Sequence, residues 1–288
     1  MLGNIIGDVA GSIAEVREMN AKKASFKVPY EERIKILDKS APLFEEGATI
    51  TDDTVLTIAV MDKLINQGTY EEKFRYYGNK ELEIGLDQRG MSSFGSFFET
   101  WLRDDIWGKM GTSYGNGASM RVAPIAYLSA YLGENLDLVT EEITLSCRPT
   151  HNNEEAIRCA LMVGAAVFYA KNCFPKKTIQ LLLQNYEYKI DYDLEYLQKN
   201  YIFSSRSSLS VPIAISVFLQ SDNFEDAIRK AISVGGDTDT IACIVGGLAE
   251  SYYGLDKDLA KQVKPYIKEY MHPIVDKYYR QVNQNVNK

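Results

Sequence analysis

The sequence predicts an all-α fold, because helical periodicity recurs along the chain and strand patterns are scarce. A chain of 288 residues holds either one large domain or two small ones. No Pro/Ser-rich linker and no internal repeat divides it. We therefore expect one compact helical domain that spans residues 1–288.

The expected helices begin at polar capping residues and end near glycine, asparagine or lysine. Residues 51–68, TDDTVLTIAVMDKLINQG, start with a Thr/Asp cap and end at Gly68. Residues 152–172 and 223–236 repeat this scheme, with asparagine and acidic residues at their start. Helical patterns also cover residues 91–104, 119–132, 137–148, 176–187, 210–220 and 257–284. The longest stretch without a continuous helical pattern runs over residues 23–50.

Composition excludes several classes of protein. Apolar residues make up 45% and charged residues 25% of the chain, which is typical of a globular protein with a buried core. The net charge of −7, without a basic stripe, argues against a nucleic-acid partner. No run reaches the ~18 apolar residues of a membrane helix. The apolar N-terminus lacks a basic start and is interrupted by Asp8, so we expect no signal peptide.

Cysteine usage points to a reducing compartment. None of the four cysteines forms a C-x-x-C pair, and most lie within or beside helical, apolar stretches. Buried free thiols explain this pattern better than a disulfide framework. We therefore expect a cytoplasmic protein, with free thiols at Cys147, Cys159, Cys173 and Cys243.

Two acidic clusters stand at helix starts, TDDT at residues 51–54 and DTDT at residues 237–240. A single Asp or Thr would suffice as a helix cap, so the second carboxylate of each cluster needs another explanation. If the two starts meet, four carboxylates share a small volume, and their repulsion raises their pKa values unless a cation lies between them. Oxygen ligands select Mg²⁺, Mn²⁺ or Ca²⁺. At this point a metal site and two unrelated helix caps remain equally open.

Three further segments favour a metal-assisted enzyme that acts on a phosphorylated small group. NIIGDVAGSIAE, residues 4–15, carries Asp8 and Glu15 in an apolar setting. SYGNGASMR, residues 113–121, is a Gly/Asn loop that opens a helix and can present backbone N–H groups to an anion. DQRGMSSFGSFF, residues 87–98, supplies a second glycine- and serine-rich loop.

Taken together, these motifs resemble the ADP-ribosylglycohydrolase family. GDVAGSIAE, TDDT, GNGASMR, THNNEEA and GGDTDTIACIVGGLAESYYG occur in the family's order from residue 3 to residue 254. The resemblance implies a compact orthogonal helical bundle with a central binuclear metal cleft. It also implies two Mg²⁺ or Mn²⁺ ions as cofactors, held by Thr51, Asp52, Asp53, Asp237, Asp239 and Thr240.

The resemblance assigns further residues to the substrate. Glu15 matches an acidic residue on a mobile flap, and Glu15, Asp52 and Asp237 are the expected catalytic residues. The SSFGS run departs from the tight glycine pattern of many members, so the contacts expected there are looser. The expected substrate-binding residues are Ser92, Ser93, Gly95, Ser113, Tyr114, Gly115, Asn116 and His151. Arg121 is interpreted as a structural ion-pair partner.

The implied activity is hydrolysis of the N- or O-glycosidic bond between ADP-ribose and an acceptor, by water attack at the anomeric carbon. The partner is an ADP-ribosylated protein or small molecule, and a monomer suffices. Residues 23–50 are expected to shape the acceptor side. The acceptor linkage and the role of Glu15, general base or substrate-orienting group, stay open. Two alternatives are a D-x-D-x-T phosphatase, which needs a strand before Asp237, and a non-catalytic ADP-ribose-binding or structural member of the family.

Overall fold

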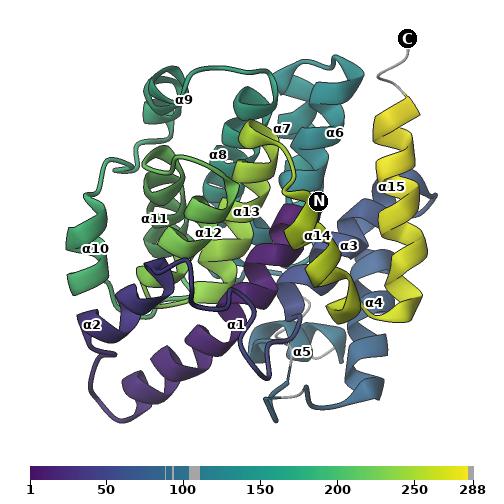
Figure 1. Ribbon diagram of the computed structural model, residues 1–288. Coiled ribbons are helices and arrows are strands. Elements are labelled where there is room, and N and C mark those ends of the chain that lie inside the picture. The colour runs from purple at the N-terminus through teal and green to yellow at the C-terminus, as the bar shows by residue number, and fades with distance from the viewer. Residues whose placement is uncertain (88, 93, 104–110, 285–288) are drawn as a thin grey trace.

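The computed structural model describes residues 1–87, 89–92, 94–103 and 111–284 (Figure 1). These residues contain helices and two isolated bridges but no strand, which confirms the predicted all-α class. The first half of the chain forms α1 (Leu2–Lys23), α2 (Tyr30–Arg33), η1 (Ile34–Leu37), α3 (Asp52–Ile65), α4 (Tyr70–Ile84), α5 (Ser96–Leu102), η3 (Asn116–Arg121), α6 (Ala123–Leu132) and α7 (Leu136–Cys147).

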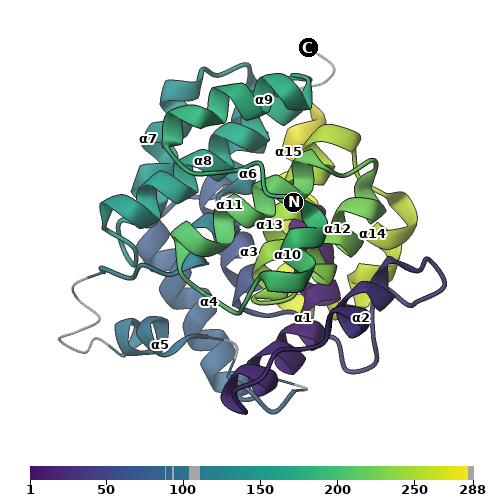
Figure 2. The same cartoon turned by 90° about the vertical axis from the view of Figure 1, so that its left-hand side faces the viewer.

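The second half of the chain packs around the same core and ends beside α3 and α4 (Figures 1 and 2). It forms α8 (Glu154–Lys171), α9 (Lys176–Leu183), η4 (Gln184–Tyr186), α10 (Leu194–Asn200), α11 (Ser207–Leu219), α12 (Phe224–Ser233), α13 (Thr238–Tyr253), α14 (Lys257–Val263), η5 (Lys264–Tyr266), η6 (Glu269–Met271) and α15 (His272–Gln284). Among these residues, no helix is both long enough and apolar enough to cross a membrane.

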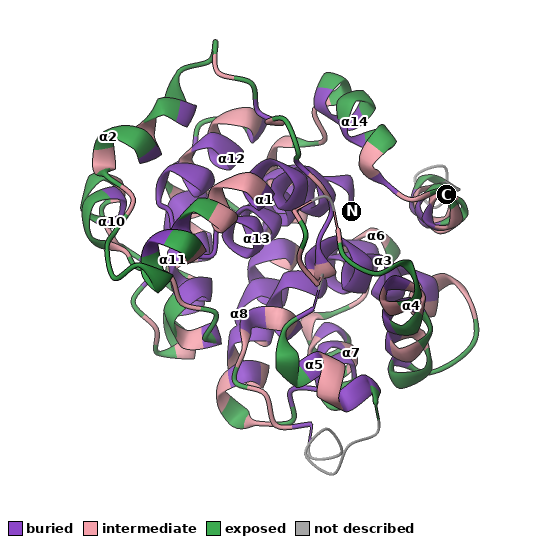
Figure 3. Cartoon of the chain, turned by 90° about the horizontal axis from the view of Figure 1, so that it is seen from below, coloured by how far each residue is buried: buried purple, intermediate pink, exposed green. Residues whose placement is uncertain are grey.

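Helices α1 and α13 form the centre of the molecule, where Figure 3 shows both as largely buried. They come from opposite ends of the sequence and make the most extensive contact between any two described helices. Their backbones touch because α1 has glycine at every fourth position of the facing stripe. A Cβ on Gly7 would lie 1.9 Å from the carbonyl oxygen of Ala242, and one on Gly11 would lie 2.4 Å from that of Thr238. No side chain larger than hydrogen fits at these positions.

Buried polar groups fix the register of this helix pair. The backbone N–H of Gly3 donates to Glu250 at 2.7 Å, which satisfies one of the free donors at the start of α1. Tyr279 of α15 accepts from the N–H of Leu2 and donates to Glu250. Asn4 donates to the carbonyl oxygens of Met120 and Cys243. These contacts set which turn of α1 faces which turn of α13, and thereby where the polar ends of both helices meet.

The structure corrects several expected boundaries. The predicted helix over residues 91–104 begins only at Ser96 within the described residues. The predicted helix over 257–284 is broken into α14, η5, η6 and α15, because Pro265 and Pro273 cannot donate to a preceding turn. Residues 23–50 contain only the short helices α2 and η1.

The four cysteines are free, as expected, and three of them are buried. Cys173 is exposed, which corrects the expectation of a buried thiol, because it lies in the turn after α8. The described residues therefore contain no disulfide bond.

Gly7→Ala tests the central contact. The new methyl group meets a backbone oxygen that cannot rotate away, so we expect the free energy of unfolding to fall by about 3 kcal/mol or more. Gly95→Ala is the matched control, because its φ is −68° and no heavy atom lies within 4 Å of the added Cβ. Its free energy of unfolding should change by less than about 0.5 kcal/mol. Equal stability of the two variants in urea unfolding would contradict the interpretation.

Candidate active site

A cavity of about 720 Å³ opens between the start of α3, the start of α13 and the segment that leads into η3. Every described residue of the expected site lies on its wall, although these residues come from all parts of the sequence. They are Glu15, Thr51, Asp52, Asp53, Ser92, Gly95, Ser113, Tyr114, Gly115, Asn116, His151, Asp237, Asp239 and Thr240. Ser93 lies outside the described residues.

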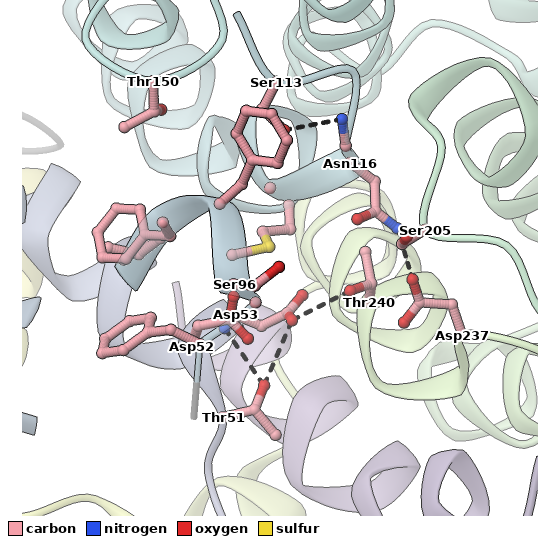
Figure 4. A pocket seen from close by; sticks show the side chains of 18 of the residues that line it. Thr51, Asp52, Asp53, Ser96, Ser113, Asn116, Thr150, Ser205, Asp237 and Thr240 are labelled. Atoms are coloured by element: carbon pink, nitrogen blue, oxygen red, sulfur yellow. Dashed lines mark hydrogen bonds between the residues drawn. The ribbon is translucent and has the colours of Figure 1, made fainter. Parts of the chain in front are cut away.

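The start of α3 supplies the first acidic cluster (Figure 4). Thr51 caps this helix by accepting from the N–H of Asp53 at 3.3 Å. One oxygen of Asp53 lies 3.3 Å from the Thr51 hydroxyl and accepts from Thr240 at 3.1 Å, so this carboxylate joins both clusters. Its other oxygen is buried without a hydrogen-bond partner. Capping therefore accounts for Thr51 but leaves Asp52 and Asp53 free for other chemistry.

The start of α13 supplies the second cluster. Gly235 and Gly236 both have a φ of +77°, a conformation that strains any other residue. The turn places Asp237 at the N-cap position, but its side chain does not cap the helix. It accepts instead from the Nδ2 of Asn116 at 2.8 Å (Figure 4). Because the preceding element is the helix α12, the strand that a D-x-D-x-T phosphatase requires is missing, and that alternative is wrong.

The carboxylates form two groups that share Asp239. Oxygens of Asp8, Asp53 and Asp239 lie within 4.8 Å of one another, and so do those of Glu15, Asp237 and Asp239. Burial and the neighbouring charges raise the pKa of Asp52 to about 8 and that of Asp237 well above its ordinary range.

This arrangement fits divalent cations. The donors are all oxygens, one oxygen of Asp53 lacks a partner, and the carboxylates repel one another unless positive charge lies between them. The residues that could hold such ions are Thr51, Asp52, Asp53, Asp237, Asp239 and Thr240, together with Asp8 and Glu15 at the edges.

Asp8 is a site residue whose role sequence reasoning missed, although its carboxylate stood out in an apolar segment. It accepts from the N–H of Thr51 at 2.9 Å, from its hydroxyl at 2.8 Å and from the N–H of Thr54 at 3.1 Å. A carboxylate of α1 thus holds the first turn of α3 and directs the Thr51 hydroxyl proton away from Asp53. The sequence does indicate a role for Asp8, because a carboxylate on the apolar face of a buried helix requires a partner.

Arg89 is the second residue that was missed. Its side chain is 4% exposed and contacts Glu15 at 2.9 Å and Asp87 at 2.7 Å. Burial and the negative charges of Asp239 and Asp237 raise the pKa of Glu15, and the positive charge of Arg89 opposes this rise. The sequence showed Arg89 only as part of a glycine- and serine-rich loop, and nothing in that pattern indicated a contact with α1.

The segment before η3 forms the opposite wall of the cavity. The N–H groups of Ser113, Gly115 and Asn116 donate to Thr150, to the Ser113 hydroxyl and to Ser205. These three backbone donors are therefore engaged within the protein, and anion binding by the other N–H groups of residues 113–121 stays a prediction. Tyr114 is 54% exposed and lies near Arg206, whose guanidinium is 5.6 Å from its ring centre.

His151 and Arg121 lie behind that segment. His151 is buried, lines the cavity, and its burial and the charge of Arg121 lower its pKa well below the ordinary value. Arg121 is buried against the ring of Phe74 and does not line the cavity. It hydrogen-bonds to uncharged oxygens, of Ser146 and Thr150, rather than to the carboxylate expected of an ion-pair partner.

Two expectations about the rim are corrected. None of residues 23–50 lines this cavity, because that segment packs against α12 and α10 instead. Glu15 lies within the continuous helix α1 and not on a separate flap. Met19, one turn further along α1, and Phe203 also line the cavity.

A sequence profile described as ADP-ribosylglycohydrolase matches residues 1–286. The chain belongs to the ADP-ribosylglycohydrolase family. It is 24% identical over 283 residues to ADP-ribosylarginine hydrolase Tri1 of Pseudomonas putida, covering 88% of this chain and 70% of that protein. It is 26% identical to ADP-ribosylhydrolase ARH3 of Xenopus tropicalis, covering 88% and 86%.

A solved structure confirms the fold of this family member. A chain of an "ADP-ribosylglycohydrolase-related protein complex" superposes with a TM-score of 0.62 at 21% identity, covering 98% of this chain and 95% of that one. Family membership and the named relatives support an ADP-ribosylhydrolase activity.

The raised carboxyl pKa values predict an unusual pH dependence of stability in chelator. A carboxyl group whose folded pKa is raised stabilises the fold while protonated. Its contribution is complete below the ordinary value of 3.8 and is lost as pH rises through about 6 for Asp8 and about 8 for Asp52. We expect the Tm in EDTA to fall across this window. Mg²⁺ or Mn²⁺ should raise the Tm, and by more at pH 8 than at pH 5, because cations bind the ionised form.

Asp52→Asn is the control variant for this experiment. It removes one titrating group and one ligand, so both the pH slope in EDTA and the stabilisation by Mg²⁺ should shrink. A Tm that stays constant or rises between pH 5 and pH 8 in EDTA would contradict the assignment of a strained carboxylate cluster.

Proposed function

We propose that this protein is a metal-dependent hydrolase that cleaves the glycosidic bond between ADP-ribose and an acceptor. The observation that carries the proposal is the arrangement of two sets of three carboxylates that share Asp239. These carboxylates lie across the cavity from a wall formed by residues 113–116 and His151. The cavity volume of about 720 Å³ lies in the ordinary range for cavities that bind small molecules. The acceptor is a protein side chain or a small molecule.

In the proposed mechanism, the ribose at the scissile bond lies over the acidic clusters and the diphosphate lies against residues 113–116. Two divalent ions, Mg²⁺ or Mn²⁺, would supply Lewis acidity toward the ribose hydroxyls and an attacking water. Thr51, Asp52, Asp53, Asp237, Asp239 and Thr240 would hold them. Asp8 fixes the hydroxyl of Thr51, and Asn116 fixes the carboxylate of Asp237 at 2.8 Å.

Glu15 is the proposed proton-transfer residue. Cleavage at the anomeric carbon passes through an oxocarbenium-like state, and a carboxylate near it can accept a proton from water or orient the acceptor. Arg89 contacts one oxygen of Glu15 at 2.9 Å, which limits the rotation of this side chain and favours its ionised form. The proposal further includes a cytoplasmic location and a single-domain monomer.

The reaction class is tested with two ADP-ribosylated peptides, one linked through serine and one through arginine, incubated with Mg²⁺ and followed by mass spectrometry. We expect release of ADP-ribose from at least one peptide, and none from Asp237→Asn or Asp239→Asn, because Asp239 belongs to both carboxylate groups and Asp237 to one of them. Absence of cleavage together with retained ADP-ribose binding would support the alternative of a non-catalytic ADP-ribose-binding member.

Glu15→Gln tests the proton-transfer role. The amide keeps the size of the side chain but cannot take a proton, so we expect kcat to fall by roughly 10²-fold or more. Binding of ADP-ribose should change little, since the proposed diphosphate contacts lie on the opposite wall. Arg89→Lys is a useful comparison because it keeps a positive charge beside Glu15. Turnover of Glu15→Gln within tenfold of wild type would show that Glu15 only orients the acceptor.

A further inference from the structure

A short chain of hydrogen bonds runs from the protein core to the cavity wall through Arg121, Thr150 and His151. Arg121 Nη2 donates to the Thr150 hydroxyl at 2.9 Å. The same hydroxyl lies 2.7 Å from Nδ1 of the His151 ring. Thr150 and His151 both belong to the turn between α7 and α8, and Arg121 ends η3. The chain therefore joins two elements that frame one side of the cavity.

The direction of each hydrogen bond follows from which groups carry protons. A guanidinium is only a donor, so the Thr150 oxygen accepts from Arg121. The hydroxyl then has one proton to donate, and among its contacts within the described residues Nδ1 of His151 is the acceptor in reach. If Nδ1 carried a proton instead, the Thr150 oxygen would accept twice and its own proton would have no acceptor among these contacts, which favours Nδ1 as the unprotonated acceptor. In a neutral imidazole the proton then resides on Nε2.

The Nε2 edge of His151 faces the segment proposed to hold the substrate. A Cβ added to Gly117 would lie 3.3 Å from this nitrogen, and one added to Gly115 would lie 3.7 Å from it. The ring lies close because both positions are glycine. The N–H groups of Ser113, Gly115 and Asn116 are engaged within the protein, so a side-chain donor such as His151 adds to what this wall can offer a ligand.

We propose that Arg121 and Thr150 are positioning residues that fix His151 as a neutral Nε2–H donor to an oxygen of the substrate. The recognised group is a hydroxyl or phosphoryl oxygen of the ADP-ribose unit, so this part of the inference rests on the proposed function. The tautomer itself does not depend on the ligand.

The burial of Arg121 stabilises this chain of hydrogen bonds. Arg121 is fully buried, stacks on Phe74 at 4.0 Å from its ring centre, and donates to the carbonyl oxygen of Ser146 near the C-terminal end of α7. A helix C-terminus carries partial negative charge, which stabilises a buried cation there. The nearby charge also disfavours a second cation, and it lowers the pKa of His151 further below its ordinary value. The imidazole therefore offers a donor without a charge of its own.

The test uses the fact that the chain has only two histidines. Long-range ¹H–¹⁵N spectra of protein labelled in histidine report which ring nitrogen carries the proton. We expect His151 of the wild type to show the Nε2–H pattern near neutral pH, in EDTA and in Mg²⁺. Thr150→Val has nearly the same shape but no hydroxyl, and it should show a mixture of tautomers. Thr150→Ser keeps the hydroxyl and should retain the wild-type pattern.

The second readout is the Kd for ADP-ribose measured by calorimetry. We expect Thr150→Val to weaken binding by about fivefold to tenfold, the usual size of one hydrogen-bond contribution, and Thr150→Ser to stay within about twofold. Thermal unfolding of both variants checks that the turn is intact.

Three results would overturn the proposal, and they are distinguishable. An Nδ1–H pattern in the wild type would refute the chain of hydrogen bonds. A Thr150→Val variant with the wild-type tautomer and Kd would refute the positioning role. A wild type with the Nε2–H pattern but no affinity for ADP-ribose would refute the recognition role and the proposed function together, while the tautomer assignment would stand.

Discussion

The backbone contact between α1 and α13 is the constraint on which the rest of the structure depends. Both helices contribute carboxylates to the acidic clusters, Asp8 and Glu15 from α1 and Asp239 from α13, and oxygens of Asp239 lie within 4.8 Å of oxygens of each of the other two. If a side chain separated the helices by the width of a methyl group, Asp8 and Glu15 would both lie further from Asp239. The glycines of α1 therefore serve the chemistry as much as the packing, because they set the distance between carboxylates.

Such a cluster stores electrostatic strain that the surrounding structure offsets only in part. The first turn of α3 gives two backbone N–H groups to Asp8, and Arg89 contacts Glu15 and Asp87. These contacts leave Asp52, Asp53 and Asp237 with raised pKa values, so the protein alone does not balance the charge. A binding site for cations is what this imbalance favours. Asp237 stands at the N-cap of α13 but accepts from Asn116 instead of capping the helix, so its carboxylate faces the cluster.

The sequence predicted the helical class and the acidic clusters of the cavity wall, because the patterns that indicate them are local in the chain. Clusters such as TDDT and DTDT exceed what helix capping requires, so they are visible without knowledge of the fold. The roles of Asp8 and Arg89 were missed because they exist only through partners distant in sequence, Thr51 for one and Glu15 for the other. The break of the C-terminal helix follows from Pro265 and Pro273, which interrupt the backbone hydrogen bonds without interrupting the helical pattern of residues 257–284. The engaged backbone of residues 113–116 was not predictable, since its partners Thr150 and Ser205 come from other segments.

The cavity divides recognition between two kinds of wall. The arginines that line it, Arg89 and Arg206, each contact a carboxylate, Glu15 and Glu155 respectively. The positive charges of both arginines are thus already paired with carboxylates of the protein. A free cationic side chain on the opposite wall would be drawn toward the acidic cluster and would compete with metal ions for it. Neutral donors avoid that competition, and the imidazole of His151, uncharged and oriented through Thr150, is such a donor. The acidic wall favours a cation, whereas the opposite wall combines a neutral donor with an arginine that is already paired. The two walls together therefore suit a ligand that presents hydroxyl groups to one side and oxygen acceptors to the other.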